Sequence, residues 1–423
     1  MELFHLFSAI LAISALFAYI NKKYIKLPGS IGLLLAGLLL SLVVQGLGAV
    51  SPEFETMVEE RLLQLDFSEF LLEFLLSFLL FAGALHTDLE KLRESKWPIM
   101  IFATVGVLIS TAVTGTLFYY LLQLLNYPID YIYCLLFGAL ISPTDPIAVL
   151  GILKRANIPK SLEVSITGES LFNDGVGVVI FISIFQVAQR GLENVEGSFI
   201  AELFLKEVGG GIGLGLLIGY IAYQFMKRID HYQTEVLISL AVVMGGYSLA
   251  QIFHFSGPLA MVAAGLLIGN QGTQFAMSKQ TADYLTKFWE MVDEIFNAVL
   301  FVLIGLELMV VEFKWEYAVT GLITTGIVLA VRYFALAVPS YTLGLHRTFA
   351  PGALSIMTWG GLRGGISIAL ALSLTPEMFR NEIVAITYTV VLLSLVVQGL
   401  TIEPFIRRIS NRSLTQLNPT DAH

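Results

Sequence analysis

The chain has 423 residues, of which 56 % are apolar and only 13 % are charged, and its mean hydropathy is +0.78. A composition this apolar excludes a soluble enzyme and indicates a membrane protein. The 24 Lys and Arg residues against 33 Asp and Glu residues leave no basic excess, which argues against a nucleic-acid partner. Because Cys134 is the only cysteine, neither an intramolecular disulfide nor a cysteine metal cluster can form.

Apolar runs of roughly 20 residues, the length of a bilayer-spanning helix, fill almost the whole chain. We therefore predict an all-α polytopic membrane protein with about thirteen transmembrane helices. The predicted spans are 3–20, 27–47, 66–86, 98–125, 131–153, 162–189, 199–226, 235–254, 257–270, 288–311, 316–344, 351–374 and 382–405. Residues 1–412 are expected to form one membrane transporter unit, and residues 413–423 a short cytoplasmic tail. No basic stretch or cleavage site flanks the first apolar run, so we expect that helix to be retained.

The distribution of Lys and Arg predicts the orientation in the membrane. The connections after odd-numbered spans, together with the C-terminus, contain 17 of these residues, and the opposite side contains 5, counting Lys206 near the start of span 199–226. Connections rich in Lys and Arg remain in the cytoplasm. We therefore expect a multi-pass protein of the cell (inner) membrane with its N-terminus outside and its C-terminus in the cytoplasm.

Three short sequence similarities recur in the same order at a separation of about 220 residues, as expected for a transporter built from two repeats. The matched positions are Gly37 with Gly265, Gly83 with Gly305, and Pro143 with Gly360. Because Gly37 lies in an even-numbered span and Gly265 in an odd-numbered one, the two repeats should have inverted topology.

A charged side chain at the centre of a bilayer is unfavourable by several kcal/mol, so each mid-span ionisable residue is a candidate functional group. The first cluster is Ser142-Pro143-Thr144-Asp145-Pro146. Its two prolines remove amide donors and disfavour the helical conformation of the residues before them, which predicts a break into two half-helices. The carbonyl groups freed by the break can coordinate a cation, and Asp145 can compensate the positive N-terminus of a half-helix.

The second cluster lies in Gly168–Gly175. Ser170 and Asp174 are four residues apart, as are Glu169 and Asn173, so the four polar side chains share one face of a helix. Burial favours the protonated form of Asp174, whereas a cation beside it favours the charged form. A proton and a metal ion would therefore compete for one carboxylate. The alternative is a purely structural polar contact between helices.

Two arginines lie inside predicted spans. Arg363 is flanked by two Gly-Gly pairs where a second broken helix is expected, and there it can offset the negative C-terminal end of a half-helix. Arg332 requires an acidic partner. Glu169 is the preferred partner, because that pairing leaves Asp174 able to titrate. A pair of Arg332 with Asp174 is the alternative, and it would disable an exchange site.

The strings S-P-T-D-P, G-E-S-L-F-N-D-G and G-G-L-R-G-G, in this order, closely resemble the monovalent cation:proton antiporters of the NhaP and animal sodium/proton exchanger branch. The resemblance covers almost the entire membrane domain. It implies two inverted repeats, crossed discontinuous helices, alternating access and a homodimer. The core or transport domain would include parts of 66–189 and 288–405, and the dimerisation or scaffold domain parts of 1–47 and 199–270.

The resemblance also implies roles for individual residues. The cation- and proton-binding residues would be Asp174, Ser170, Thr144 and Asn173, with Na⁺ on the first three and Asn173 stabilising the site. The other implied roles are an ion pair of Glu169 with Arg332 and compensation of helix dipoles by Asp145 and Arg363. Ala82 stands where some relatives have a carboxylate, a ligand that water can replace.

We therefore predict a secondary transporter, not an enzyme, that needs no cofactor and exchanges Na⁺, or Li⁺, for H⁺. The Asn-Asp pair at 173–174, where other relatives have Asp-Asp, implies an electroneutral 1:1 exchange. One alternative is the same machine acting as a K⁺/H⁺ antiporter. Another is a channel-like or solute carrier that uses the broken helices for a different substrate. Exchange moves protons without net current, whereas a channel carries current.

Overall fold

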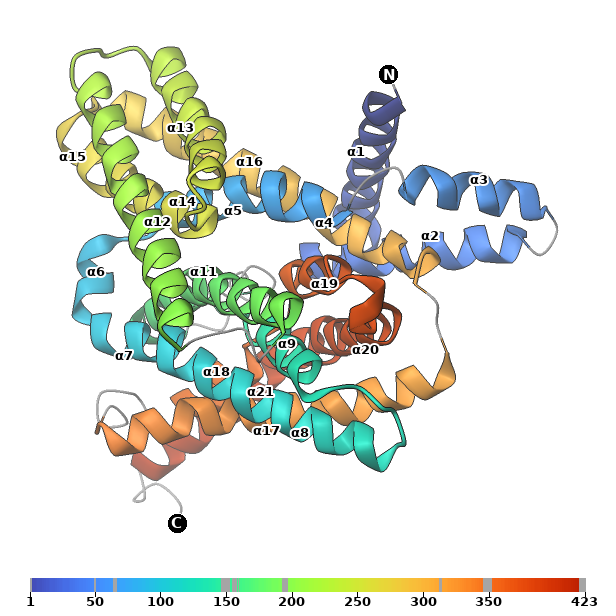
Figure 1. Cartoon of the computed structure of the whole chain (residues 1–423). Coiled ribbons are helices and arrows are strands. Elements are labelled where there is room, and N and C mark those ends of the chain that lie inside the picture. The colour runs from blue at the N-terminus through green and yellow to red at the C-terminus, as the bar shows by residue number, and fades with distance from the viewer. Residues whose placement is uncertain are drawn as a thin grey trace.

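The computed structural model describes residues 2–48, 51–63, 67–145, 153, 158, 160–191, 197–311, 314–344 and 352–417. All regular secondary structure within these ranges is helical (Figure 1). The elements up to residue 190 are α1 (Glu2–Ile20), η1 (Asn21–Ile25), α2 (Gly29–Gly48), α3 (Pro52–Leu63), α4 (Phe67–Glu69), η2 (Phe70–Leu75), α5 (Leu76–Leu85), α6 (Leu89–Glu94), α7 (Lys96–Ile101), η3 (Phe102–Gly106), α8 (Val107–Leu124), α9 (Tyr131–Ile141) and α11 (Lys160–Arg190). The later elements are α12 (Gly197–Met226), α13 (Tyr232–Ile252), α14 (Gly257–Leu267), η5 (Ile268–Gly272), α15 (Thr273–Phe275), α16 (Lys279–Leu306), η6 (Glu307–Met309), α17 (Trp315–Thr342), α18 (Ala353–Trp359), α19 (Gly365–Leu372), η8 (Pro376–Met378), α20 (Arg380–Leu393), η9 (Ser394–Gln398) and α21 (Gly399–Leu417).

The fold is that of an all-helical protein with many membrane spans. Nine helical runs in the described ranges are long and apolar enough to cross a bilayer. The other four predicted spans also contain helices. Two of them are interrupted, at α9 and between α18 and α19, a third contains the short α14, and the fourth lies in α16, whose first half carries several charges. The acidic segment that follows the second predicted span forms the helix α3.

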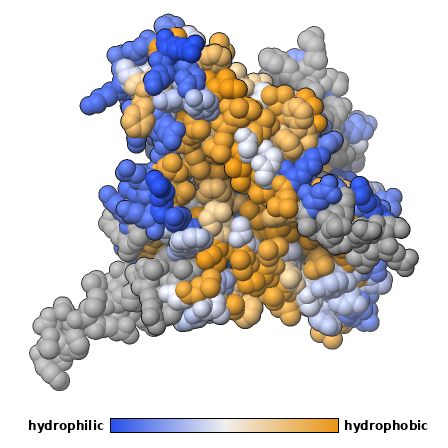
Figure 2. Space-filling view, turned by 60° about the vertical axis from the view of Figure 1, so that its left-hand side comes forward, coloured by the Kyte–Doolittle hydropathy of each residue, from blue (hydrophilic) through white to orange (hydrophobic). Residues whose placement is uncertain are grey.

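The helices run between two sides of the molecule. In Figure 1, α6, α15 and the turn between α12 and α13 lie at the left, whereas α3 and the connection from α8 to α9 lie at the right. The first group follows odd-numbered predicted spans and the second group follows even-numbered ones. Figure 2 shows a broad hydrophobic area in the middle of one face, bordered by hydrophilic patches. An exposed hydrophobic area of this kind is compatible with contact to lipid in a bilayer.

Two hydrophobic clusters form the core. One joins α8, α9, α17, α19 and α20 with parts of α2, η2 and α11. The other joins α5, α12, α13 and α14. The helix α16 belongs to both, because Trp289 lies in the second cluster and Phe301 in the first. Leu171 places α11 in the second cluster as well, so α11 lies at the boundary between the two.

Glycines allow two pairs of helices to approach closely. A Cβ atom on Gly37 of α2 would lie 2.7 Å from the carbonyl oxygen of Val302 on α16, and a Cβ atom on Gly305 would lie 2.7 Å from the backbone of Gly37. A Cβ atom on Gly265 of α14 would lie 2.7 Å from the carbonyl oxygen of Phe81 on α5. In a membrane, where lipid is as apolar as a leucine side chain, such close backbone packing supplies much of the attraction between helices.

These two crossings involve segments that recur in the sequence. Gly37 and Gly265 are one of the recurring pairs, and the segments of α16 and α5 that they contact are another. In the repeat, α2 therefore corresponds to α14, and the contacted segment of α16 corresponds to α5. The contact of α2 with α16 in the structure is thus matched by the contact of α14 with α5. The third recurring pair consists of the interrupted segments after α9 and α18, and these two contact each other. Two structurally repeated halves would produce a contact pattern of this kind.

The crossing of α2 with α16 gives the first testable prediction. Gly37→Ala should destabilise the protein by about 1–3 kcal/mol, because the added methyl group overlaps the backbone of α16. Thermal unfolding in detergent, followed by tryptophan fluorescence, measures the effect. Gly46→Ala in the same helix is the matched control, since no atom lies within 4 Å of its Cβ position. Equal melting temperatures of the two variants would contradict the crossing.

Candidate functional site

The first interruption follows α9. The regular helix ends at Ile141, and Ser142–Asp145 leave it. Pro143 has no amide hydrogen, so the helical hydrogen-bond pattern cannot continue through it. The Ser142 hydroxyl donates to the carbonyl oxygen of Gly138 at 2.6 Å, and its oxygen lies 3.0 Å from Ser110 Oγ on α8. The second proline of the motif, Pro146, lies outside the described residues.

The second interruption, Gly360–Gly364, separates α18 from α19 and meets the first one. The Asp145 amide donates to the carbonyl oxygen of Leu362 at 2.8 Å. Arg363 Nη1 donates to the carbonyl oxygens of Ser142 at 2.6 Å and Pro143 at 2.9 Å. The buried Arg363 guanidinium therefore lies at the C-terminal end of α9, where carbonyl groups lack helical partners and carry negative partial charge.

Asp145 lies at the N-terminal end of a helix, whereas Arg363 lies at a C-terminal end. A Cβ atom on Gly364 would lie 2.6 Å from Asp145 Oδ2, so this carboxylate packs against the residue that precedes α19. The N-terminus of a helix carries positive partial charge, which favours a carboxylate. The glycine at 364 leaves the space that the Asp145 side chain occupies. Each interruption thus supplies a charged residue to a helix end of the other interruption.

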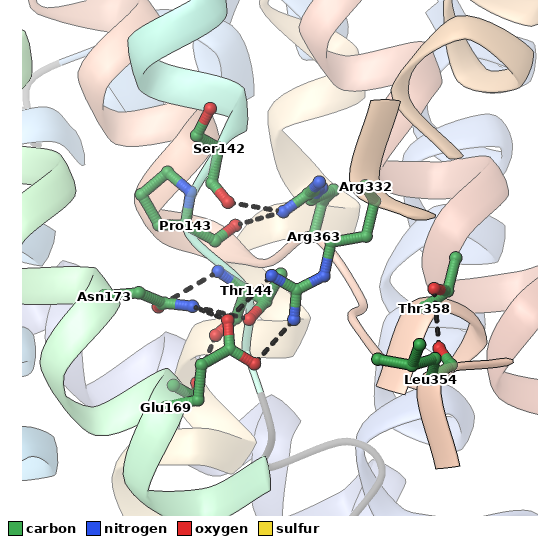
Figure 3. A network of polar contacts seen from close by, with 10 residues as sticks. Ser142, Pro143, Thr144, Glu169, Asn173, Arg332, Leu354, Thr358 and Arg363 are labelled. Atoms are coloured by element: carbon green, nitrogen blue, oxygen red, sulfur yellow. Dashed lines mark hydrogen bonds and ion pairs between the residues drawn. The ribbon is translucent and has the colours of Figure 1, made fainter. Parts of the chain in front are cut away.

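The polar face of α11 covers the first interruption. Asn173 Nδ2 donates to Thr144 Oγ1 at 2.8 Å and to Glu169 Oε1 at 3.0 Å, and Asn173 Oδ1 accepts from the Thr144 amide at 3.3 Å. The Ser170 hydroxyl donates to the carbonyl oxygen of Thr144. Figure 3 shows Asn173 and Glu169 facing Thr144, with the two arginines on its other side. The amide, hydroxyl and carbonyl groups of Thr144 are therefore all engaged by α11.

Glu169 also forms a buried ion pair with α17. Arg332 Nη1 donates to Glu169 Oε1 at 2.7 Å and Nη2 to Oε2 at 2.6 Å, a bidentate arrangement. Only 4 % of Arg332 and 1 % of Glu169 are exposed. Arg332 thus pairs with Glu169, the partner that the sequence analysis prefers, rather than with Asp174.

Asp174 differs from the other charged groups of the site. It is only 7 % exposed, and its Oδ1 atom has no hydrogen-bond partner among the described residues. The charged groups that act on it are the carboxylates of Asp145 and Glu169, which have the same sign. A buried carboxylate without a partner is unfavourable unless a proton or a cation neutralises it. The geometry therefore leaves Asp174 as a carboxyl group that can take up either one.

Neutral oxygen atoms lie in the same network. Ser170 precedes Asp174 by one helical turn on α11, and its hydroxyl contacts the carbonyl group of Thr144; such hydroxyl and carbonyl groups are hard oxygen ligands. The described part of the chain contains no group of three or more His, Cys, Asp or Glu side chains that could hold a metal ion. One carboxylate with neutral oxygens is a donor set for transient binding rather than for a resident divalent metal.

The structure brings the predicted site residues together and adds two that the sequence analysis missed. The Arg363 amide donates to Ser394 Oγ at 3.1 Å, and the Ser394 hydroxyl donates to Gln398 Oε1 at 2.6 Å. Gln398 Nε2 in turn donates to the carbonyl oxygen of Trp359 at 3.0 Å. Both residues lie on η9 and support the second interruption. In the sequence, these two polar residues can be recognised by their spacing of four within an apolar span, which places them on one helix face.

Comparison with known proteins places this site in a family. A family model described as "Sodium/hydrogen exchanger, transmembrane" matches residues 11–408. The chain belongs to this family. Its members are transporters, so the chain is a transporter rather than an enzyme.

Individual relatives extend the comparison. The chain is 49 % identical over 409 residues to the Na(+)/H(+) antiporter NhaP of Pseudomonas aeruginosa, with 96 % of each sequence covered. It is 34 % identical over 395 residues to the Na(+)/H(+) antiporter NhaH of Halobacillus dabanensis, and the matched region covers 92 % of this chain and 93 % of the relative. The structure of the sodium proton antiporter MjNhaP1 from Methanocaldococcus jannaschii has the same fold, with a TM-score of 0.77 at 20 % identity and coverage of 97 % and 99 %.

The buried ion pair yields a prediction on stability. Arg332→Gln should destabilise the protein by about 3–5 kcal/mol, because Glu169 would remain buried without its partner. The melting temperature in detergent and the fraction of monodisperse protein after mild heating measure the loss. Arg407→Gln is the control, since its pair with Glu403 at 2.7 Å is exposed, and such pairs contribute about 0–1 kcal/mol. A similar loss of stability in both variants would show that the buried ion pair contributes no more than an exposed one.

Proposed function

We propose that the chain exchanges Na⁺ for H⁺ across the membrane and that Asp174 binds both ions in turn. The observation that supports this assignment most directly is the buried Oδ1 atom of Asp174, which has no hydrogen-bond partner among the described residues and lies one helical turn from Ser170, whose hydroxyl contacts Thr144. The bidentate pair with Arg332 occupies the other acid of the strip, Glu169. The printed names of the relatives, which are Na⁺/H⁺ antiporters, support the same ions.

Competition at one carboxylate couples the two ions. When Asp174 is charged, a cation can bind it together with oxygens of Ser170 and Thr144. When Asp174 is protonated, its negative charge is gone and the attraction for a cation falls. The site therefore carries a cation in one direction and a proton in the other. Each occupant brings one positive charge, so the exchange ratio is 1:1 and the cycle is electroneutral.

The groups around Asp174 hold the site without titrating themselves. Asn173 links Thr144 to Glu169 through an uncharged amide. Asp145 and Arg363 each balance a helix end of the opposite interruption, so the extended backbone remains stable when the site is empty. Asp174 is then the only member of the network whose charge has to change during the cycle.

Alternating access follows from an inverted repeat. Thirteen spans in two halves of opposite topology would produce the matched crossings of α2 with α16 and of α14 with α5. A core built from parts of 66–189 and 288–405 would move against a scaffold built from parts of 1–47 and 199–270. The scaffold would form a homodimer in the cell membrane, with the N-terminus outside and the tail in the cytoplasm.

Transport assays on proteoliposomes test the assignment of Asp174. With a pH gradient imposed, addition of Na⁺ should dissipate the gradient through the wild-type protein, and Asp174→Asn should abolish this dissipation because the amide cannot bind a proton. A decrease of about 100-fold or more is expected, since proton transfer by a positioned group commonly contributes that much. A fluorescent pH indicator inside the vesicles gives the rate.

Asp283→Asn is the matched control, because its carboxylate is exposed and pairs with Lys287 at the start of α16. It should transport like the wild type. If Asp174→Asn retained Na⁺-dependent proton movement, the proton would be carried elsewhere, and Glu169 or Asp145 would be the next candidates.

The exchange ratio and the ion can be tested in the same vesicles. A 1:1 exchange predicts the same rate whether valinomycin and K⁺ clamp the membrane potential at zero or at an inside-negative value. A rate that changes with potential would contradict electroneutrality, and a steady current would favour the channel-like alternative. Replacing Na⁺ by Li⁺ or, with a different potential clamp, by K⁺ ranks the ions. Faster exchange with K⁺ than with Na⁺ would identify the protein as a K⁺/H⁺ antiporter.

A further inference from the structure

An apolar cavity of about 230 Å³ lies between α11 and the helices of the second hydrophobic cluster. Side chains of α12 and of α14 between Leu259 and Leu267 form most of its wall, and Phe172 of α11 closes one side. Leu89 of α6 and Gln271 of η5 form one end. Gln271 supplies the only polar side chain among the lining residues.

The lining excludes a hydrated cation as the occupant. A cation that sheds water needs oxygen ligands to replace it, and the wall between Leu259 and Leu267 offers only hydrocarbon. A hydrocarbon chain is the complementary ligand, because burial of each of its methylene groups against this wall is favourable. The cavity is thus chemically distinct from the ion site, although Phe172 precedes Asn173 directly in the sequence.

The cavity is continuous with the surface that faces lipid. Leu216, which lines it, is 46 % exposed, and the adjacent Leu217, which does not line it, is 57 % exposed. Further large apolar side chains, including Ile221 and Phe225, are exposed along α12 towards its C-terminal end. Figure 2 shows the hydrophobic area on this side of the molecule. A chain from the bilayer can therefore enter from the side.

The end formed by Leu89 bears charges of both signs, because Asp88, Glu90 and Glu94 accompany Lys91 and Arg93 on α6 and its N-cap. The Leu89 amide donates to Asn270 Oδ1 at 2.8 Å, which fixes the start of α6 beside η5. Arg93 follows Leu89 by four residues and so shares its helix face. Arg93 is exposed and forms no hydrogen bond or ion pair within the described part of the chain, whereas Lys91 is paired with Asp88 at 2.6 Å. An exposed guanidinium at the mouth of an apolar cavity complements the phosphate of a lipid headgroup.

We propose that this cavity binds one acyl chain of an anionic phospholipid, with Arg93 at the headgroup phosphate. The lipid comes from the leaflet on the side of α6, which the Lys and Arg distribution predicts to be cytoplasmic. The chain would contact α11 on one side and α12 and α14 on the other. It would thereby stabilise the arrangement of these helices that the structure shows.

The consequence for transport rests on the proposed function. Alternating access requires α11 to move relative to α14, and Leu259 already fills the space where a Cβ of Gly175 on α11 would lie. A lipid chain wedged beside this contact would have to be displaced or remodelled in each cycle. The lipid would therefore tune the exchange rate without touching Asp174.

Photochemical cross-linking tests the binding site directly. The purified protein is reconstituted in vesicles that contain phosphatidylglycerol with a diazirine in its acyl chain, and cross-linked peptides are mapped by mass spectrometry. Cross-links should concentrate on 259–267 of α14. Leu216→Trp fills the cavity and should reduce them by about tenfold or more, because the indole displaces several methylene groups. The matched control, Leu217→Trp, should leave them unchanged. Equal labelling along the exposed face of α12 would overturn the proposal.

A second arm tests the headgroup. Cross-linking of diazirine-labelled phosphatidylglycerol should exceed that of the corresponding phosphatidylcholine, and Arg93→Gln should lower this preference about fivefold. Arg228→Gln removes an exposed arginine elsewhere on the same predicted side and should not change it. Equal labelling by the two lipids in the wild type would overturn the role of Arg93. Asp174→Asn should keep the cross-links, so a failure of the exchange mechanism is separable from a failure of lipid binding.

Discussion

The need to neutralise the buried charges of the site without water governs its arrangement. Arg332 and Glu169 neutralise each other across two helices. Arg363 is neutralised by the carbonyl end of α9, and Asp145 lies against the start of α19. Two of these three solutions use helix ends rather than opposite charges, and helix ends inside a membrane exist only where helices are broken. The interruptions and the buried charges therefore require each other.

Within the site, Asp174 is the exception to this pattern. Asp174 is buried next to two carboxylates, and its Oδ1 has no partner in the described part of the chain. A buried carboxylate with a purely structural role would have a charged or hydrogen-bonding partner, as Glu169 has in Arg332. The amide of Asn173 is the complementary choice at the neighbouring position, because it donates and accepts hydrogen bonds without adding a third titrating group to the strip.

The sequence predicts much of this arrangement because local rules act strongly at the decisive residues. The two prolines at 143 and 146 together favour a break in the helix. The spacing of Glu169 and Asn173 places them on one helix face in any helical context. Other features depend on how distant segments approach. The support of Arg363 by Ser394 and the acyl-sized cavity beside Phe172 arise from tertiary packing, which no local pattern encodes.

The meeting of the two interruptions also has a consequence for biosynthesis. Arg363 binds the carbonyl group of Ser142 from 221 residues away along the chain. At ordinary rates of translation this separation corresponds to roughly 10 to 40 s. During that time the first interrupted segment resides in the membrane with the carbonyl groups at the end of α9 and the Asp145 carboxylate lacking their final partners. The nascent first half is therefore the stage at which an insertase or a membrane chaperone has the most unsatisfied polar backbone to shield.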